Sequence, residues 1–208
     1  AGGRVVALGA STGGPAALVS VLGAFEGAPP CSLVVSQHMP EGFTNSFAQR
    51  LDRQTAFSAR EARDGDPIQP GLVLVAPGGQ HLEFEEVSGQ TRARLLPGRS
   101  SDRYAPSIDR MFASAAKHFG TRLTAVLLTG MGDDGAEGTC AVSHAGGTVV
   151  AESEKTAVVF GMPQQAIRRG VVDFVLPLGE IAGVIAGEPG ASAAAGCPPS
   201  SEDWKECQ

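Results

Sequence analysis

The feature that most constrains this chain is a short apolar run near its start, which breaks abruptly into a glycine-rich turn. The run, Val5–Leu8, is rich in β-branched residues and predicts a buried strand of a parallel sheet. Residues 9–14 (GASTGG) follow at once, and Pro15 stands where a helix can begin. Such a turn brings polar side chains and free helix N–H groups to the carboxyl edge of the sheet. We therefore expect an α/β fold with its functional site at this edge.

Residues 9–13 fit the G-x-S-x-G pattern, in which the turn holds a serine hydroxyl, here that of Ser11, over the sheet edge. A dinucleotide-binding loop fits less well, because its glycine spacing differs and it requires an acidic residue after the second strand, which here ends in Ser36-Gln37-His38. A Walker-type phosphate loop requires Gly-Lys-Ser/Thr, which is absent. An ordinary glycine turn, in which Ser11 only caps a helix, stays open on this stretch alone.

The amino-acid composition narrows the classes of protein to which this chain can belong. The 208 residues suffice for one well-buried α/β domain, and 28 glycines fit a sheet with many tight turns. The 22 acidic residues outnumber the 16 basic ones and no basic cluster occurs, which argues against nucleic acid or an anionic membrane as a partner. No apolar run has the length of a membrane span, no signal peptide is recognisable, and the four cysteines form no Cys-x-x-Cys pair. We expect a cytoplasmic protein with no direct membrane insertion.

Hydrophobic periodicity predicts alternating strands and helices. Further strands are expected at 32–36, 57–62, 72–76, 123–128, 148–151 and 174–176, and helices at 15–24, 44–54, 107–118, 136–145, 164–169 and 178–186. Residues 81–85 and 91–95 form a predicted antiparallel hairpin, and Thr44 is expected to cap its helix. The predicted fold is a doubly wound α/β domain over residues 1–186, with a mainly parallel sheet, helices on both faces and one hairpin. Residues 187–208, rich in Pro, Gly, Ala and Ser, are predicted to form a flexible tail that folding does not require.

Three chemically complementary groups each follow an apolar strand: Ser11, His38 and the pair Asp133-Asp134. A serine hydroxyl is a poor nucleophile until a base takes its proton, and an imidazole base needs a carboxylate to fix its tautomer. If the strands are parallel neighbours, these groups face one crevice. The order Ser, His, Asp differs from the Ser, Asp, His order of α/β-hydrolases. The residues therefore predict a serine hydrolase of another family.

Three segments resemble the signatures of the bacterial chemotaxis receptor methylesterases, the CheB-type protein-glutamate methylesterases. They are residues 9–15 (GASTGGP), 37–44 (QHMPEGFT) and 128–136 (LTGMGDDGA), with further matches at 76–82, 106–109 and 160–167. The resemblance extends from about Val5 to Ala186. It implies hydrolysis of glutamate γ-methyl esters on the cytoplasmic helices of methyl-accepting chemotaxis receptors, with release of methanol and no cofactor. It also implies deamidation of selected receptor glutamines.

Carried over by motif, the resemblance assigns Ser11 as the nucleophile and His38 as the general base. The carboxylate is Asp134, directly before the glycine of the Met-Gly-x-Asp-Gly motif, while Asp133 fills its variable position. Chemistry of this kind also needs donors aimed at the developing alkoxide. The candidates for this oxyanion hole are the backbone N–H groups of Thr12, Gly13 and Met131.

The chain departs from the family pattern in two short stretches. Arg103-Tyr104-Ala105-Pro106 replaces an Arg-His-Arg-Pro-like stretch, and Gln164-Gln165 stands where a basic residue is usual. Arg103 and Tyr104 are therefore candidates for the rim of the substrate site. Family members usually begin with a phosphorylatable receiver domain and none is expected here, so a receiver domain or histidine kinase would be a partner outside this chain. Activity is accordingly expected without phosphorylation.

Other polar residues are interpreted as structural. His81 is expected to be structural at the start of the hairpin, and His118 and His144 to close helices. Cys140 is expected to be a small buried residue. A Mg²⁺ site is only weakly indicated by the acidic residues Asp133, Asp134 and Glu137, and we expect no metal. Two alternative functions stay open: a nucleotide- or phosphate-binding α/β module and a non-catalytic docking domain.

Overall fold

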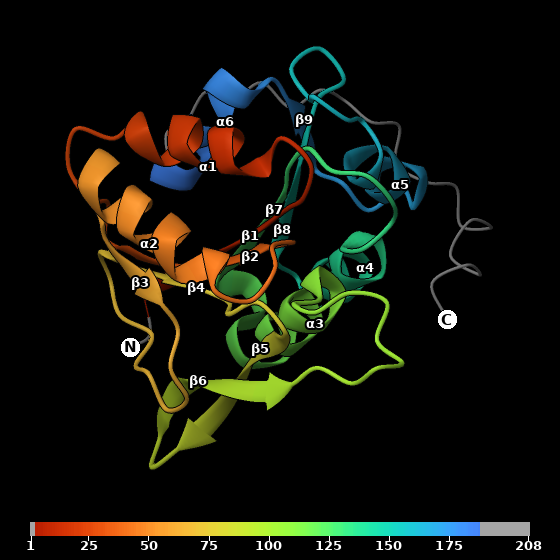
Figure 1. The fold of residues 1–208 in the computed structure, drawn as a ribbon. Helices are drawn as coiled ribbons and strands as arrows, with labels where there is room; N and C mark the ends of the chain where they lie inside the picture. The colour runs from red at the N-terminus through yellow and green to blue at the C-terminus, as the bar shows by residue number, and fades with distance from the viewer. Residues whose placement is uncertain (1–2, 188–208) are drawn as a thin grey trace.

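Seven parallel strands, in the order β3-β4-β2-β1-β7-β8-β9, form the centre of the fold (Figure 1). The computed structural model describes residues 3–187, so most of the predicted tail lies outside the described residues. The strands of the sheet are β1 (Arg4–Ala10), β2 (Cys31–Gln37), β3 (Ser58–Glu61), β4 (Leu72–Val75), β7 (Leu123–Leu127), β8 (Thr148–Glu152) and β9 (Phe174–Leu176). Two further strands, β5 (Gln80–Val87) and β6 (Gln90–Pro97), pair as an antiparallel hairpin.

Helices cover both faces of the sheet. They are α1 (Gly14–Gly23), α2 (Phe43–Gln54), α3 (Ile108–Phe119), α4 (Ala136–His144), α5 (Met162–Arg168) and α6 (Leu178–Ala186), with a short 3₁₀ turn at Gly120–Arg122. Alternate residues of β1 point to opposite faces, as the pleat of a strand requires. Val6 and Leu8 pack with α1, α2 and α6, whereas Val5 and Ala7 pack with α3, α4 and α5. The doubly wound α/β fold predicted from the sequence is thereby confirmed.

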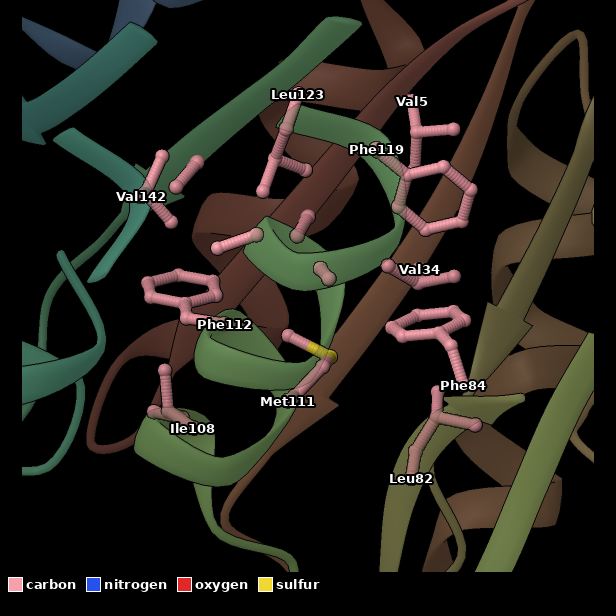
Figure 2. Close-up of a cluster of buried hydrophobic side chains, with 14 of the residues drawn as sticks. Val5, Val34, Leu82, Phe84, Ile108, Met111, Phe112, Phe119, Leu123 and Val142 are labelled. Atoms are coloured by element: carbon pink, nitrogen blue, oxygen red, sulfur yellow. The ribbon is translucent and has the colours of Figure 1, made fainter. Parts of the chain in front are cut away.

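The hairpin extends the core on one side of the sheet. Figure 2 shows Leu82 and Phe84 of β5 lying beside Met111 of α3, which in turn lies over the sheet. These side chains are fully or almost fully buried. Their packing fixes α3 against both the sheet and the hairpin, and the first turn of α3 is the part of this layer that reaches the candidate site.

The observed elements differ from the predicted ones mainly at their ends. β1 continues to Ala10, because Gly9 and Ala10 still pair with β2. The expectation that Thr44 caps α2 is wrong: the helix is preceded by Gly42 at φ 84°, with no side-chain cap. The Thr44 hydroxyl is buried instead, where it donates to Glu61 and accepts the N–H of Gly78 at 3.1 Å. In residues 3–187, no helix has both the length and the apolar character needed to cross a bilayer.

Candidate active site

Three neighbouring strands, β2, β1 and β7, deliver the predicted catalytic side chains to one edge of the sheet. Ser11 follows β1, His38 follows β2, and Asp134 lies in the loop between β7 and α4. In the sheet, β2, β4 and β3 lie on one side of β1, whereas β7, β8 and β9 lie on the other. Open α/β sheets form a crevice at such a reversal of strand order, outside the carboxyl ends of the strands. The sheet topology therefore explains why residues 96 positions apart in sequence meet here.

His38 lies between the other two side chains. Its Nδ1 is 3.1 Å from the Ser11 Oγ, and its Nε2 is 2.7 Å from the Asp134 Oδ2. A carboxylate only accepts hydrogen bonds, so this network assigns the ring proton to Nε2. Nδ1 is then the unprotonated nitrogen that faces the serine hydroxyl. The three side chains form the hydrogen-bonded line that general-base activation of a serine requires.

Asp134 is held by the first turn of α3 as well as by His38. Its Oδ2 accepts the N–H of Ile108 at 2.7 Å, and its Oδ1 accepts the N–H of Asp109 at 2.9 Å and the hydroxyl of Ser107 at 3.1 Å. A helix N-terminus offers free N–H groups and a positive dipole end to a negative charge. Burial raises the pKa of Asp134, but hydrogen bonds from His38, Asp109 and Ile108 outweigh it, and the pKa lies below the ordinary carboxyl value. The carboxylate is therefore kept ionised next to the imidazole.

Asp109 makes the reciprocal contact with the next helix. Its Oδ1 accepts the N–H of Gly135 at 2.8 Å and of Gly138 at 2.7 Å, at the start of α4. Each of the two helices thus has its N-terminus bound by a carboxylate from the other segment. Burial raises the pKa of Asp109 to about 6; the hydrogen bonds from Gly138 and Gly135 oppose the rise, and the charge of Asp134 adds to it.

The turn that carries Ser11 is closely packed against the loop after β7. The Ser11 N–H donates to the carbonyl of Thr129 at 3.0 Å. A Cβ at Gly130 would come within 2.8 Å of the Ser11 Cβ, so only glycine allows this approach. Across residues 3–187, no acceptor is hydrogen-bonded to the backbone N–H of any of the three predicted oxyanion donors. Those donors are Thr12, Gly13 and Met131.

The two residues predicted for the substrate rim occupy different places. The Arg103 side chain is exposed and forms an ion pair with Asp133 at 2.9 Å. The Tyr104 ring is stacked on the His38 imidazole, with 4.6 Å between ring centroids and 6° between planes. A pocket of about 290 Å³ lies beside them, lined also by Met39 and Pro40. Arg103 therefore stands at the surface of the crevice, whereas Tyr104 is part of its inner wall.

Sequence reasoning missed several residues of this region. Val158 is one of them, and its side chain is strongly exposed, at 71%; Met131, which was predicted as an oxyanion donor, is likewise exposed, at 72%. Val158 lies against the Ser11 turn, because a Cβ at Gly13 would come within 2.8 Å of it. No sequence signal indicated Val158. The roles of Ser107 and Asp109 were also missed, although both lie in a segment that resembles the family.

The other polar candidates have structural partners. His81 is buried, with Nε2 2.8 Å from Asp102 and Nδ1 accepting the N–H of Ser107 at 3.2 Å. His118 and His144 lie in the last turns of α3 and α4, and Cys140 is buried in α4. The suggested Mg²⁺ cluster is divided among three partners: Asp133 pairs with Arg103, Glu137 with Arg169, and Asp134 with His38. In the part of the chain that the structure describes, no three His, Cys, Asp or Glu side chains form a group suited to a metal ion.

Comparison with known proteins identifies the same family as the sequence motifs. Residues 6–185 match the family model described as CheB methylesterase. A Geobacter sulfurreducens protein, "Protein-glutamate methylesterase/protein-glutamine glutaminase 3", is 53% identical over 84% of this chain and 47% of its own length. A Myxococcus xanthus protein, "Protein-glutamate methylesterase/protein-glutamine glutaminase 1", is 51% identical over 88% of this chain and 53% of its own length. The chain thus spans about half the length of these curated relatives.

A solved structure gives the same answer for the fold. The crystal structure of the Thermotoga maritima CheB methylesterase catalytic domain superimposes with a TM-score of 0.86 and 39% sequence identity. The match covers 90% of this chain and 99% of that one. With the family model spanning nearly all of the described fold and relatives above 50% identity, the chain belongs to the CheB methylesterase family.

Proposed function

We propose that this chain is a serine hydrolase that removes methyl groups from glutamate γ-methyl esters of methyl-accepting chemotaxis receptors and deamidates selected receptor glutamines. The observation that carries the proposal is the position of His38, within hydrogen-bond distance of both the Ser11 hydroxyl and the Asp134 carboxylate. The family membership and the names of the relatives, protein-glutamate methylesterase/protein-glutamine glutaminase, supply the substrate class.

In the first half of the reaction, the Ser11 Oγ attacks the carbonyl carbon of the γ-ester while His38 Nδ1 accepts the hydroxyl proton. Asp134 accepts the Nε2–H and stabilises the imidazolium that forms. The tetrahedral intermediate carries its negative charge on the former carbonyl oxygen. The N–H groups of Thr12, Gly13 and Met131 are the proposed donors to that oxygen.

In the second half, the intermediate collapses and the methoxy group leaves as methanol with the proton from His38. The resulting acyl–Ser11 ester is hydrolysed when His38 takes a proton from water, and the hydroxide adds to the acyl carbon. Collapse returns the proton to the Ser11 oxygen and frees the glutamate. A glutamine side chain follows the same steps, with ammonia as the leaving group. All proton transfers are thus assigned to groups of this chain.

The wider organisation is part of the same proposal. Residues 1–186 would form the catalytic domain, with the receptor's cytoplasmic helices as its macromolecular substrate, and the reaction would occur in the cytoplasm. Because the relatives are about twice as long as the matched segment, a receiver domain or a histidine kinase is a proposed regulatory partner. Arg103, exposed beside the crevice, is a candidate contact to the receptor.

The test is methanol release from a methylated receptor fragment, comparing the wild-type chain with Ser11→Ala. Ser36→Ala is a matched control, because Ser36 also lies near the carboxyl edge of the sheet and its buried Oγ has no hydrogen-bond partner among the described residues. We expect Ser11→Ala to abolish release and Ser36→Ala to retain it. Unchanged release by Ser11→Ala would refute the proposal.

A further inference from the structure

Gln37, the last residue of β2, connects the proposed nucleophile and base without taking part in the proton transfers. Its side chain is buried, with 1% of the residue exposed. The Nε2 donates to the backbone carbonyl of Ser11 at 2.9 Å and to the backbone carbonyl of His38 at 3.0 Å. One carboxamide thus binds the main chain of both residues at once.

The orientation of this carboxamide follows from its acceptors. Carbonyl oxygens only accept hydrogen bonds, so the amino group must face both of them and the oxygen must point away. Oε1 points toward Gly14 at the start of α1 and has no hydrogen-bond partner among the described residues. A Cβ at Gly14 would overlap it. Gly13 and Gly14 are thus required for different reasons. Gly13 has φ 83°, a conformation that favours glycine, whereas Gly14 leaves space for the Gln37 amide.

The pairing of β1 with β2 ends just before the catalytic residues. Ala10 and Gln37 are the last register pair, and one further bond joins the His38 N–H to the Ala10 carbonyl at 3.0 Å. Beyond this point the Ser11 segment turns into α1 and the His38 segment enters the loop before α2. Beyond this last ladder bond, the Gln37 amide links the backbones of the two segments, in addition to the contact between the His38 and Ser11 side chains.

We propose that Gln37 is a positioning residue, whose carboxamide holds the Ser11 and His38 backbones at the separation that keeps Oγ and Nδ1 within hydrogen-bond distance. A misplacement of about 1 Å between reacting groups can cost on the order of 100-fold in rate. The inference rests on the proposed function only for its kinetic readout.

The decisive variant is Gln37→Met, which keeps the length of the side chain and removes both donors. We expect kcat for methanol release to fall roughly 10- to 100-fold, with KM changed by no more than about twofold, because buried Gln37 does not touch the substrate. Leu33→Ala is the control, since it removes buried packing from the same strand far from the site. It is expected to lower the melting temperature while leaving kcat near the wild-type value.

Gly14→Ala is a second perturbation of the same contact, because its Cβ would overlap the Gln37 Oε1, and would also come within 2.7 Å of the Ala10 Cβ, while Gln37 itself is retained. It is expected to lower kcat as Gln37→Met does. Near-wild-type kcat in folded Gln37→Met overturns the inference, as does a rise in KM with kcat unchanged. If Gln37→Met does not fold, a wild-type kcat in Gly14→Ala overturns it instead.

A spectroscopic readout separates this inference from the proposed function. The His38 Nε2–H that bridges to Asp134 is expected to give a downfield proton resonance, which reports the placement of the ring without any substrate. We expect this resonance to shift or broaden in Gln37→Met and to persist in Leu33→Ala. If wild type releases no methanol, the proposed function fails while this comparison still tests Gln37, and an unchanged resonance in Gln37→Met refutes its positioning role.

Discussion

Replacing Asp134 by asparagine is expected to damage both stability and catalysis, although the two side chains have the same shape. Each carboxylate oxygen accepts a backbone N–H: Oδ2 that of Ile108 and Oδ1 that of Asp109. In Asp134→Asn one oxygen becomes an NH₂ group, so either orientation of the amide leaves one buried N–H facing another donor. The buried site leaves no orientation that satisfies both N–H groups and His38.

The magnitude follows from these contacts. A buried N–H left without an acceptor costs about 1–3 kcal/mol. Loss of the negative charge at the N-terminus of α3 adds up to about 2 kcal/mol. We therefore expect the free energy of unfolding to fall by about 1–5 kcal/mol. If the amide NH₂ faces His38 it also forces the ring proton onto Nδ1, where the imidazole no longer accepts the Ser11 proton, and kcat should fall by about 10³- to 10⁴-fold.

Asp133→Asn is the matched control for this substitution. The Asp133 side chain is 54% exposed and pairs with the exposed Arg103, and such a pair contributes at most about 1 kcal/mol. Urea unfolding followed by circular dichroism and methanol release from a methylated receptor fragment measure the two effects. If Asp134→Asn has the same free energy of unfolding as the wild type, the argument that Asp134 stabilises the N-terminus of α3 is refuted. Equal losses of activity in Asp133→Asn and Asp134→Asn would refute the assignment of the carboxylate.

Three further outcomes are expected. The kcat/KM should fall in acid, because a general base that is already protonated cannot accept the serine proton; a flat profile would contradict a histidine base. Because folding raises the pKa of Asp109, its protonated form stabilises the folded protein. This contribution is fully present below the ordinary carboxyl pKa and is lost as the pH rises through about 6. Urea unfolding should accordingly show Asp109→Asn more stable than wild type at pH 8, by up to about 3 kcal/mol, with no gain at pH 4; equal gains at both would exclude this cause. Tyr104→Leu should lower kcat by about tenfold through loss of the stacked ring, whereas Tyr104→Phe should retain it; equal rates in both variants would show that the stack does not position His38.

The sequence predicted those parts of the site that depend on local pattern. Ser11, His38 and Asp134 each follow a short apolar run, and the carboxyl ends of parallel strands meet at one edge. The doubly wound fold follows from the same runs and the helical periodicity between them. Each of these features is encoded within a short continuous segment, so it is readable without coordinates.

The remaining contacts depend on how distant segments approach each other. Thr44 stands where a helix cap is expected, yet its hydroxyl bonds β3 and the loop after β4, which no local pattern indicates. Tyr104 was predicted at the rim because its segment departs from the family, but its ring lies on His38 through the path of a long loop. The bonds of Gln37 likewise depend on the exact register of β1 against β2.

The exchange of carboxylates between α3 and α4 bears on how a member of this family would lose its activity. Asp134 belongs at once to the proposed reaction and to the docking of two helices, whereas the Ser11 hydroxyl has no hydrogen bond among residues 3–187 beyond the one to His38. Mutations that remove Asp134 are therefore expected to lower stability as well as activity. Inactive descendants that survive as folded proteins should retain the aspartate and have lost the serine or the histidine. An aspartate at this position in a related sequence accordingly says little about activity, and the residue at position 11 says much more.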